Sequence, residues 1–176
     1  IDIAGNFIQK NKTQIKKTLK SPKAIKDPVI IYTYESKWKN HSDNSQYNLA
    51  RAVETALKHI IDSCKEDNKD IKNQEILFLG RFNFEIDRLV ESGLFEFKNG
   101  KTKIKSLAYP DLKITFMTAH ASKGLGYDNV IVINGKNGIF GFPSKIENDP
   151  VLNYVVKTDN AIEAAEERRL FYVAMT

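Results

Sequence analysis

Cysteine is almost absent from this chain of 176 residues, which contains only Cys64. A single cysteine cannot form an internal disulfide, so a reducing compartment is favoured and we expect a cytoplasmic protein. The three histidines (His41, His59 and His120) are scattered and do not form a zinc site with Cys64 at any usual spacing, so no metal site is predicted. No apolar run approaches the length of a membrane span, and no basic leader opens the sequence. These scarcities argue against a disulfide scaffold, a zinc module and a membrane-spanning protein.

The composition that is present suits one globular domain, with 41% hydrophobic and 28% charged residues. The net charge is +5, and much of it is local, because seven lysines lie between Lys10 and Lys26. A basic flank suits a polyanionic partner, although a solvated helix face is the simpler interpretation. The chain begins without methionine and ends within a helical pattern, and we expect it to be a piece of a longer protein.

Apolar strands alternate with amphipathic helices along the chain, which predicts an α/β fold with a parallel sheet. Strands are expected at residues 29–34, 75–80, 114–118 and 129–134. Helices are expected at residues 2–19, 47–64, 82–91, 149–156 and 161–176, with a helical turn at 122–125. Residues 93–113 are ambiguous, and a hairpin is one option.

A polar loop follows the strand that ends at Thr118, and ligands in open parallel sheets lie outside the carboxyl ends of strands. Ser122 can cap a short helix whose free N–H groups favour an anion. Gly124 permits close backbone approach, and Lys123 supplies positive charge. An anion site is therefore indicated, and an ordinary strand, turn and helix with a surface lysine remains the alternative.

The last predicted helix places Arg169 within an apolar stripe at 100° per residue. The stripe consists of Ile162, Ala165 and Val173. A charge in such a position must find an anion or a partner. A structural pair with Glu163 or Glu166 is the alternative.

Two patterns together resemble the motor motifs of UvrD/Rep-like superfamily I helicases. Thr118-x-His120-x-x-Lys123-Gly124-Leu125 is similar to motif V, and the pattern from Glu166 to Thr176 is similar to motif VI. The strand and arginine at Ile76–Arg81 resemble the motif IVa region, and Ala121-Ser122 and Gly141-Phe142-Pro143 resemble the DNA helicase IV branch of the family.

This resemblance implies a second RecA-like motor domain over residues 1–176, a three-layer α/β/α sandwich with helices on both faces of the sheet. It implies ATP and Mg²⁺ as cofactors, held mainly by an N-terminal RecA-like domain of the same chain, and single-stranded DNA as a partner. By position in the motifs, Arg169 is the catalytic arginine finger, which stabilises charge in phosphoryl transfer. The cofactor-binding residues would be Gly124, Arg81 and Lys123, and the DNA-binding residues would be His120, Ser122 and Thr118.

The sequence departs from the family in three respects. It has no phosphate-binding loop, because Phe95 stands where Gly100-Lys101-Thr102 would need an earlier glycine, so we expect this domain alone to be inactive and residues 100–102 to be a hairpin turn. Gly126 replaces the family's ribose-binding glutamate, for which Asp128 could substitute. Residues 93–113 would be a short insert in place of a large helical subdomain. The rival interpretations are the motor half of an AddA- or RecB-like helicase–nuclease, a non-motor nucleic-acid-binding module, and an unrelated doubly wound protein.

Overall fold

The computed structural model describes residues 2–11, 28–35, 45–136, 138–142, 144 and 160–175, with the side chains of the last segment described from 165 to 172. The strands are β1 (Glu75–Gly80), β2 (Phe95–Asn99), β3 (Lys103–Ser106), β4 (Lys113–Thr118) and β5 (Asn129–Val132). The helices are α1 (Asp2–Ile8), α2 (Ser45–Glu66), the 3₁₀ turn η1 (Ile71–Asn73), α3 (Phe84–Glu91) and α5 (Asn160–Met175).

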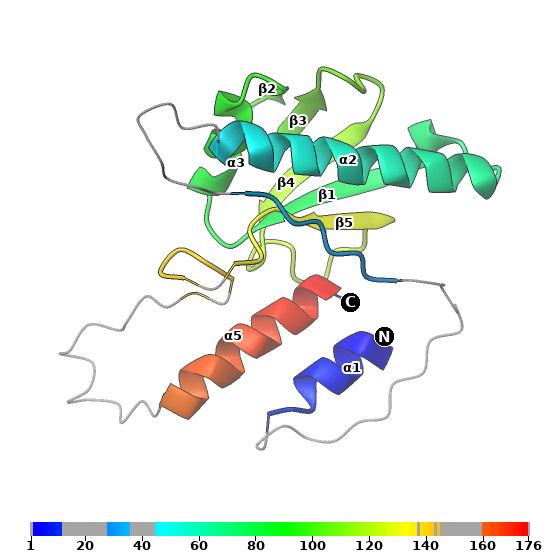
Figure 1. Cartoon of the computed structure of the whole chain (residues 1–176). Helices are drawn as coiled ribbons and strands as arrows, with labels where there is room; N and C mark the ends of the chain where they lie inside the picture. Colours follow the sequence, from blue (N-terminus) through cyan, green and yellow to red (C-terminus); the bar gives the residue numbers. More distant parts are fainter. Residues whose placement is uncertain are drawn as a thin grey trace.

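The five strands form one mixed sheet in the order β2-β3-β4-β1-β5 (Figure 1). β1 pairs in parallel with both β4 and β5, whereas β2 and β3 are antiparallel to their neighbours. The predicted α/β class is confirmed, but the prediction of a wholly parallel sheet is wrong. The reason is the segment between α3 and β4, which folds as a hairpin added to the sheet because its turn is too short for a crossover helix.

The two faces of β1 pack against different helices, because successive side chains of a strand point to opposite faces. Ile76 and Phe78 belong to a core shared with α2 and α3. Leu77 and Leu79 belong to a second cluster, against which Leu170 and Phe171 of α5 pack. α1 lies beside α5 (Figure 1), and Phe7 contacts Phe171 with ring centroids 5.5 Å apart.

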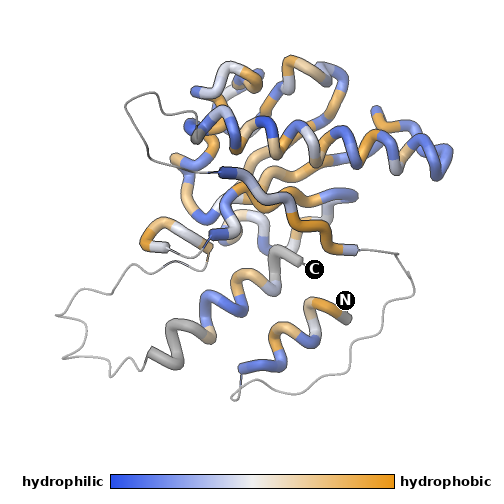
Figure 2. Tube along the Cα trace, viewed as in Figure 1, coloured by the Kyte–Doolittle hydropathy of each residue, from blue (hydrophilic) through white to orange (hydrophobic). Residues whose placement is uncertain are grey.

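α2 follows the predicted helical period closely and extends the expected 47–64 by about half a turn at each end. Its buried residues include Ala50, Val53 and Leu57, while Arg51, Thr55 and Lys58 are exposed between them. Figure 2 shows this as hydrophilic segments along α2 above strands that are mostly hydrophobic. A helix with one apolar stripe can bury only that stripe against the sheet.

Several predicted boundaries differ in the structure. Residues 28–35 are extended but join no described strand, so the strand predicted at 29–34 is wrong; Ile31 is 82% exposed, and Asn48 Nδ2 donates to the Glu35 carbonyl at 3.0 Å. The helix predicted at 2–19 ends at Ile8 and is followed by a turn at 9–11. The rest of that helix and the one predicted at 149–156 lie outside the described residues.

Candidate functional site

The predicted site residues converge where the parallel strands β1 and β4 end. Gly80 lies opposite Thr118 in the register, and the Ala119 amide donates to the Gly80 carbonyl at 2.9 Å. Arg81 and His120 therefore follow neighbouring strands at one edge of the sheet, the edge at which α/β folds bind ligands.

The turn that carries Arg81 is organised by Glu85, a carboxylate that is 2% exposed. One carboxylate oxygen accepts from the amides of Arg81 at 2.5 Å and Phe82 at 3.1 Å, and the other accepts from Asn134 Nδ2. The buried carboxylate is thus satisfied by fixed donors at the start of α3. These bonds delay the first turn of α3 to Phe84, two residues after the predicted start.

Gly80 is the residue that lets Glu85 approach the chain so closely. A Cβ on Gly80 would lie 2.6 Å from a Glu85 carboxylate oxygen and 2.9 Å from the Phe116 ring. Any side chain at this position would displace the carboxylate or the ring, so glycine is required by close approach.

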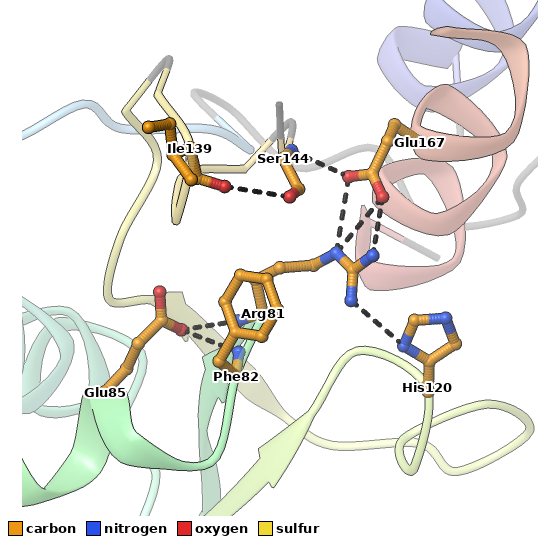
Figure 3. Close-up of polar contacts among 7 residues, drawn as sticks. All are labelled: Arg81, Phe82, Glu85, His120, Ile139, Ser144 and Glu167. Atoms are coloured by element: carbon orange, nitrogen blue, oxygen red, sulfur yellow. Dashed lines mark hydrogen bonds and ion pairs between the residues drawn. The ribbon is translucent and has the colours of Figure 1, made fainter. Parts of the chain in front are cut away.

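The side chain of Arg81 is bound by Glu167 from the inner side of α5 (Figure 3). Arg81 Nη2 and Nε donate to Glu167 Oε1 at 2.7 and 3.2 Å, and the two side chains are 17% and 16% exposed. Arg81 Nη1 lies 3.5 Å from His120 Nδ1. Glu167 Oε2 also accepts from the Ser144 amide at 3.0 Å. Arg81 is therefore mostly enclosed and ion-paired in this structure.

The neighbouring arginine of the same helix has a different partner. Arg168 donates to Asn11 Oδ1, and its guanidinium lies 6.0 Å from the centroid of the Phe7 ring. Asn11 Nδ2 in turn donates to the Ala165 carbonyl at 3.1 Å. Arg168 therefore joins α5 to α1, and sequence reasoning assigned it no role.

Arg169 is exposed, so its predicted place within an apolar stripe is wrong. The side of α5 that faces the sheet carries Leu170 and Phe171 together with Glu167. Two residues of helix turn through about 200°, which places Arg169 on the other side of α5 from Glu167.

The loop after β4 contains the predicted DNA-binding and remaining cofactor residues. His120 and Lys123 are exposed, and Gly124 is exposed with φ +83°, a conformation that favours glycine. Ser122 is buried; its hydroxyl donates to the Ala119 carbonyl at 3.1 Å and caps no helix, because residues 122–125 form only a turn. The expected helix cap is therefore wrong. Thr118 Oγ1 accepts from the Ala121 amide at 3.4 Å and supports the same turn.

Two other sequence expectations have clear outcomes. Asp128 accepts from the Glu75 amide at 2.8 Å, at the amino end of β1, so the carboxylate lies at the wrong end of the sheet to replace the ribose-binding glutamate. Residues 100–102 form the predicted hairpin turn, where Gly100 has φ +64° and Lys101 pairs with Asp87 at 2.7 Å.

Glu85, Asn134 and Glu167 were not singled out from the sequence, although they organise the site. Glu85 carried a usable signal, because acids are favoured in the first turn of a helix. Asn134 donates to the Phe140 carbonyl at 2.8 Å as well as to Glu85, and contacts of this kind across a loop leave no periodic pattern. Glu167 lies 86 residues from Arg81 in the sequence.

Other features of the described residues do not compete with this edge as a site. Two open surface depressions, of about 430 and 290 Å³, lie along α2 on the far side of the sheet from α5, lined mainly by polar side chains. Within the described ranges, no group of three or more acidic, histidine or cysteine side chains could hold a metal ion. No helix of the described part is long and apolar enough to cross a membrane.

Comparison with known proteins supports the class of protein that the two motifs resemble. Residues 94–176, from just before β2 to the end of the chain, match the UvrD-like helicase C-terminal domain. The matched residues include both motifs, which confirms their resemblance to UvrD-like helicases. It is 28% identical over 175 residues to DNA helicase IV of Escherichia coli (strain K12), an alignment that covers 99% of this chain and 21% of that protein. The chain therefore spans about a fifth of the length of this relative. No solved structure matches.

Proposed function

We propose that this chain is the second RecA-like motor domain of an ATP-dependent DNA helicase or translocase, in which helices cover both faces of the sheet as a three-layer sandwich. The observation that carries the proposal is the meeting of three motif-like segments at one sheet edge. Arg81 after β1, His120 after β4 and Glu167 on α5 are in contact, although they are far apart in sequence. Helicase similarity in residues 94–176 and to DNA helicase IV supports the same function.

The residues of this chain suit a polyphosphate. Arg169 and Lys123 are exposed cations, and Gly124 allows the backbone to approach a ligand. Mg²⁺-ATP, when bound, supplies the phosphoryl group that is transferred to water. In the proposal, the Mg²⁺ site and the phosphate-binding loop belong to an N-terminal RecA-like domain of the same protein. This chain adds Arg169 of α5 as the arginine finger and, at the sheet edge, Arg81, Lys123 and Gly124 as cofactor-binding residues.

Single-stranded DNA is the proposed second ligand. His120 is exposed beside Arg81, so the loop after β4 can contact a DNA strand while remaining joined to the cofactor side. Ser122 and Thr118 would act by holding this loop in shape, since both hydroxyls are engaged within it. A DNA strand bound to this loop would alter the contact between His120 and Arg81. A translocating motor needs such a connection between its DNA site and its nucleotide site.

The test is the substitution Arg169→Ala in the full-length protein. ATP turnover stimulated by single-stranded DNA should fall by about 10³- to 10⁵-fold, because charge in the transition state loses its stabilising arginine. Binding of a fluorescent ATP analogue should largely survive. Arg51→Ala is the matched control, since Arg51 is an exposed arginine of α2, with 62% of its side chain accessible. Unchanged turnover in Arg169→Ala would refute the arginine finger.

Two further measurements separate the rival functions. The isolated chain should hydrolyse no ATP, and measurable activity from it would contradict the division of labour between two domains. A nuclease assay on the full-length protein distinguishes a helicase–nuclease of the AddA or RecB kind from a helicase. A full-length protein that binds single-stranded DNA but neither binds nor hydrolyses ATP would be the non-motor module instead.

A further inference from the structure

The guanidinium of Arg81 is only partly used by its ion pair. An arginine side chain carries five N–H donors in a rigid plane. Glu167 engages the Nε and Nη2 side, at 3.2 and 2.7 Å from Oε1. The Nη1 side is directed to His120, whose Nδ1 lies 3.5 Å away and can accept when the ring proton is on Nε2. Donors therefore remain on the side that faces the loop after β4.

Glu167 also binds one further segment beside Arg81, the loop that follows β5. Its second oxygen accepts from the Ser144 amide at 3.0 Å, and Ser144 Oγ donates to the Ile139 carbonyl at 2.9 Å. One carboxylate thus joins α5, the end of β1 and the loop that follows β5 (Figure 3). Glu85 holds the Arg81 main chain from the opposite side. Between them, the two carboxylates fix both the position and the direction of the arginine.

We propose that Glu167 is a positioning residue, which holds Arg81 so that its Nη1 side is presented to a phosphate of the nucleotide. This inference rests on the proposed function and adds a role that the motif resemblance does not supply. Charge-assisted binding on one edge of a guanidinium leaves the remaining edge preorganised for a second anion. Because His120 contacts the same edge, displacement of His120 by a DNA strand changes what Arg81 can bind.

The experiment uses three variants of the full-length protein, Glu167→Gln, Arg81→Gln and the double variant. Glu167→Gln should lower kcat/KM for ATP by about 10- to 100-fold, the loss expected when a binding group is misplaced by a fraction of an ångström to an ångström. In the Arg81→Gln background, Glu167→Gln should change kcat/KM by less than about twofold, because Glu167 acts through Arg81. Glu66→Gln is the control, since Glu66 is an exposed acid at the end of α2, away from this edge of the sheet.

Thermal melting separates positioning from a structural role. Each single variant should melt at a lower temperature, since it leaves one partly buried charge unpaired. The double variant should recover much of this loss, because two neutral amides can hydrogen-bond, yet its turnover should stay as low as that of Arg81→Gln. A double variant that regains turnover along with its melting temperature would overturn the inference and leave Glu167 as a structural residue.

The remaining outcomes are distinct. Additive effects of the two substitutions on kcat/KM, or a Glu167→Gln variant with normal kinetics, would contradict the positioning role while the proposed function stands. An Arg81→Gln variant with normal kinetics would contradict both the positioning role and the place of Arg81 among the cofactor residues. Failure of the motor function as a whole is measured separately by Arg169→Ala.

Discussion

The two faces of the sheet are held in different ways. On the α2 and α3 face, β1 contributes Ile76 and Phe78, both fully buried, to the larger of the two apolar clusters. On the α5 face, the described cluster is smaller, and polar pairs accompany it: Arg81 with Glu167, and Arg168 with Asn11. A buried apolar contact cannot be replaced by a contact with a polar ligand. One member of an ion pair, by contrast, can bind a charged ligand in place of its partner. The α2 face therefore serves as a scaffold, and the α5 face is suited to change.

The largest expected effect comes from two adjacent residues of β1 that point to opposite faces. Phe78→Ala should cost about 3–5 kcal/mol of the free energy of unfolding, and Leu79→Ala should fall nearer the lower end of about 2–5 kcal/mol, because its smaller cluster can collapse more easily. Both residues are 0% exposed, so exposure does not bias the comparison.

Hydrogen exchange compares Phe78→Ala and Leu79→Ala helix by helix, so it tests the difference between the two faces more directly. Phe78→Ala should reduce amide protection in α2, and Leu79→Ala should reduce it in α5 while α2 keeps its protection. Equal loss of protection in both helices from Leu79→Ala would show that the two faces open as one unit, and the distinction drawn above would be wrong.

A smaller effect is expected at the junction between the faces. Gly80→Ala should destabilise by about 1–3 kcal/mol, because the added methyl group meets the Glu85 carboxylate and the Phe116 ring. Urea denaturation measures the loss. Gly126→Ala is the control, since nothing lies within 4 Å of its added Cβ, and it should stay within about 0.5 kcal/mol. Similar losses in both variants would mean that the close approach at Gly80 is readily relaxed.

The smallest expected effect concerns Cys64, which is buried at the end of α2. Burial raises the pKa of its thiol above the usual range, with smaller opposing and supporting effects from Lys69, Asp67 and Asp128. A raised folded-state pKa means that the thiol's contribution is complete below the unfolded pKa of about 8.5 and is lost as pH rises through the folded value.

Unfolding measured from pH 7 to 10 in the natural protein and in Cys64→Ala checks this sign. The stability advantage of the natural protein over the variant should shrink as pH increases. A difference that stays constant or grows with pH would place Cys64 in a more polar setting than the scaffold face provides.

The sequence pattern correctly predicted those helices and strands whose bounds depend on neighbouring residues in the chain. β1 has the predicted bounds because a continuous apolar run is bounded by polar residues, and α2 follows its helical period. The strand predicted at 29–34 was wrong because β-propensity is read from residues 29–34 alone, whereas a strand forms only where a second strand pairs with it. The sheet is mixed because residues 95–106 fold back as a hairpin, a choice that periodicity alone did not decide.

The site was predictable where a residue follows a strand. Arg81, Thr118 and His120 could be placed at one edge, since parallel strands bring their carboxyl ends together. The pair between Arg81 and Glu167 depends on how α5 docks, which no spacing within either segment encodes. For the same reason the exposure of Arg169 was missed, because the apolar stripe was read from residues of α5 alone.

The hairpin of β2 and β3 gives this domain an attachment point for probes. Its turn at Gly100 joins β2, the outermost strand on that side of the sheet, to β3, and Thr102 in the turn accepts from the Phe116 amide of β4 at 2.7 Å. A fluorophore or affinity tag attached at the exposed Gly100 would be carried by the sheet itself, with β3 and β4 lying between β2 and β1. Movements of α5 during a catalytic cycle could then be followed against a fixed reference within the same chain.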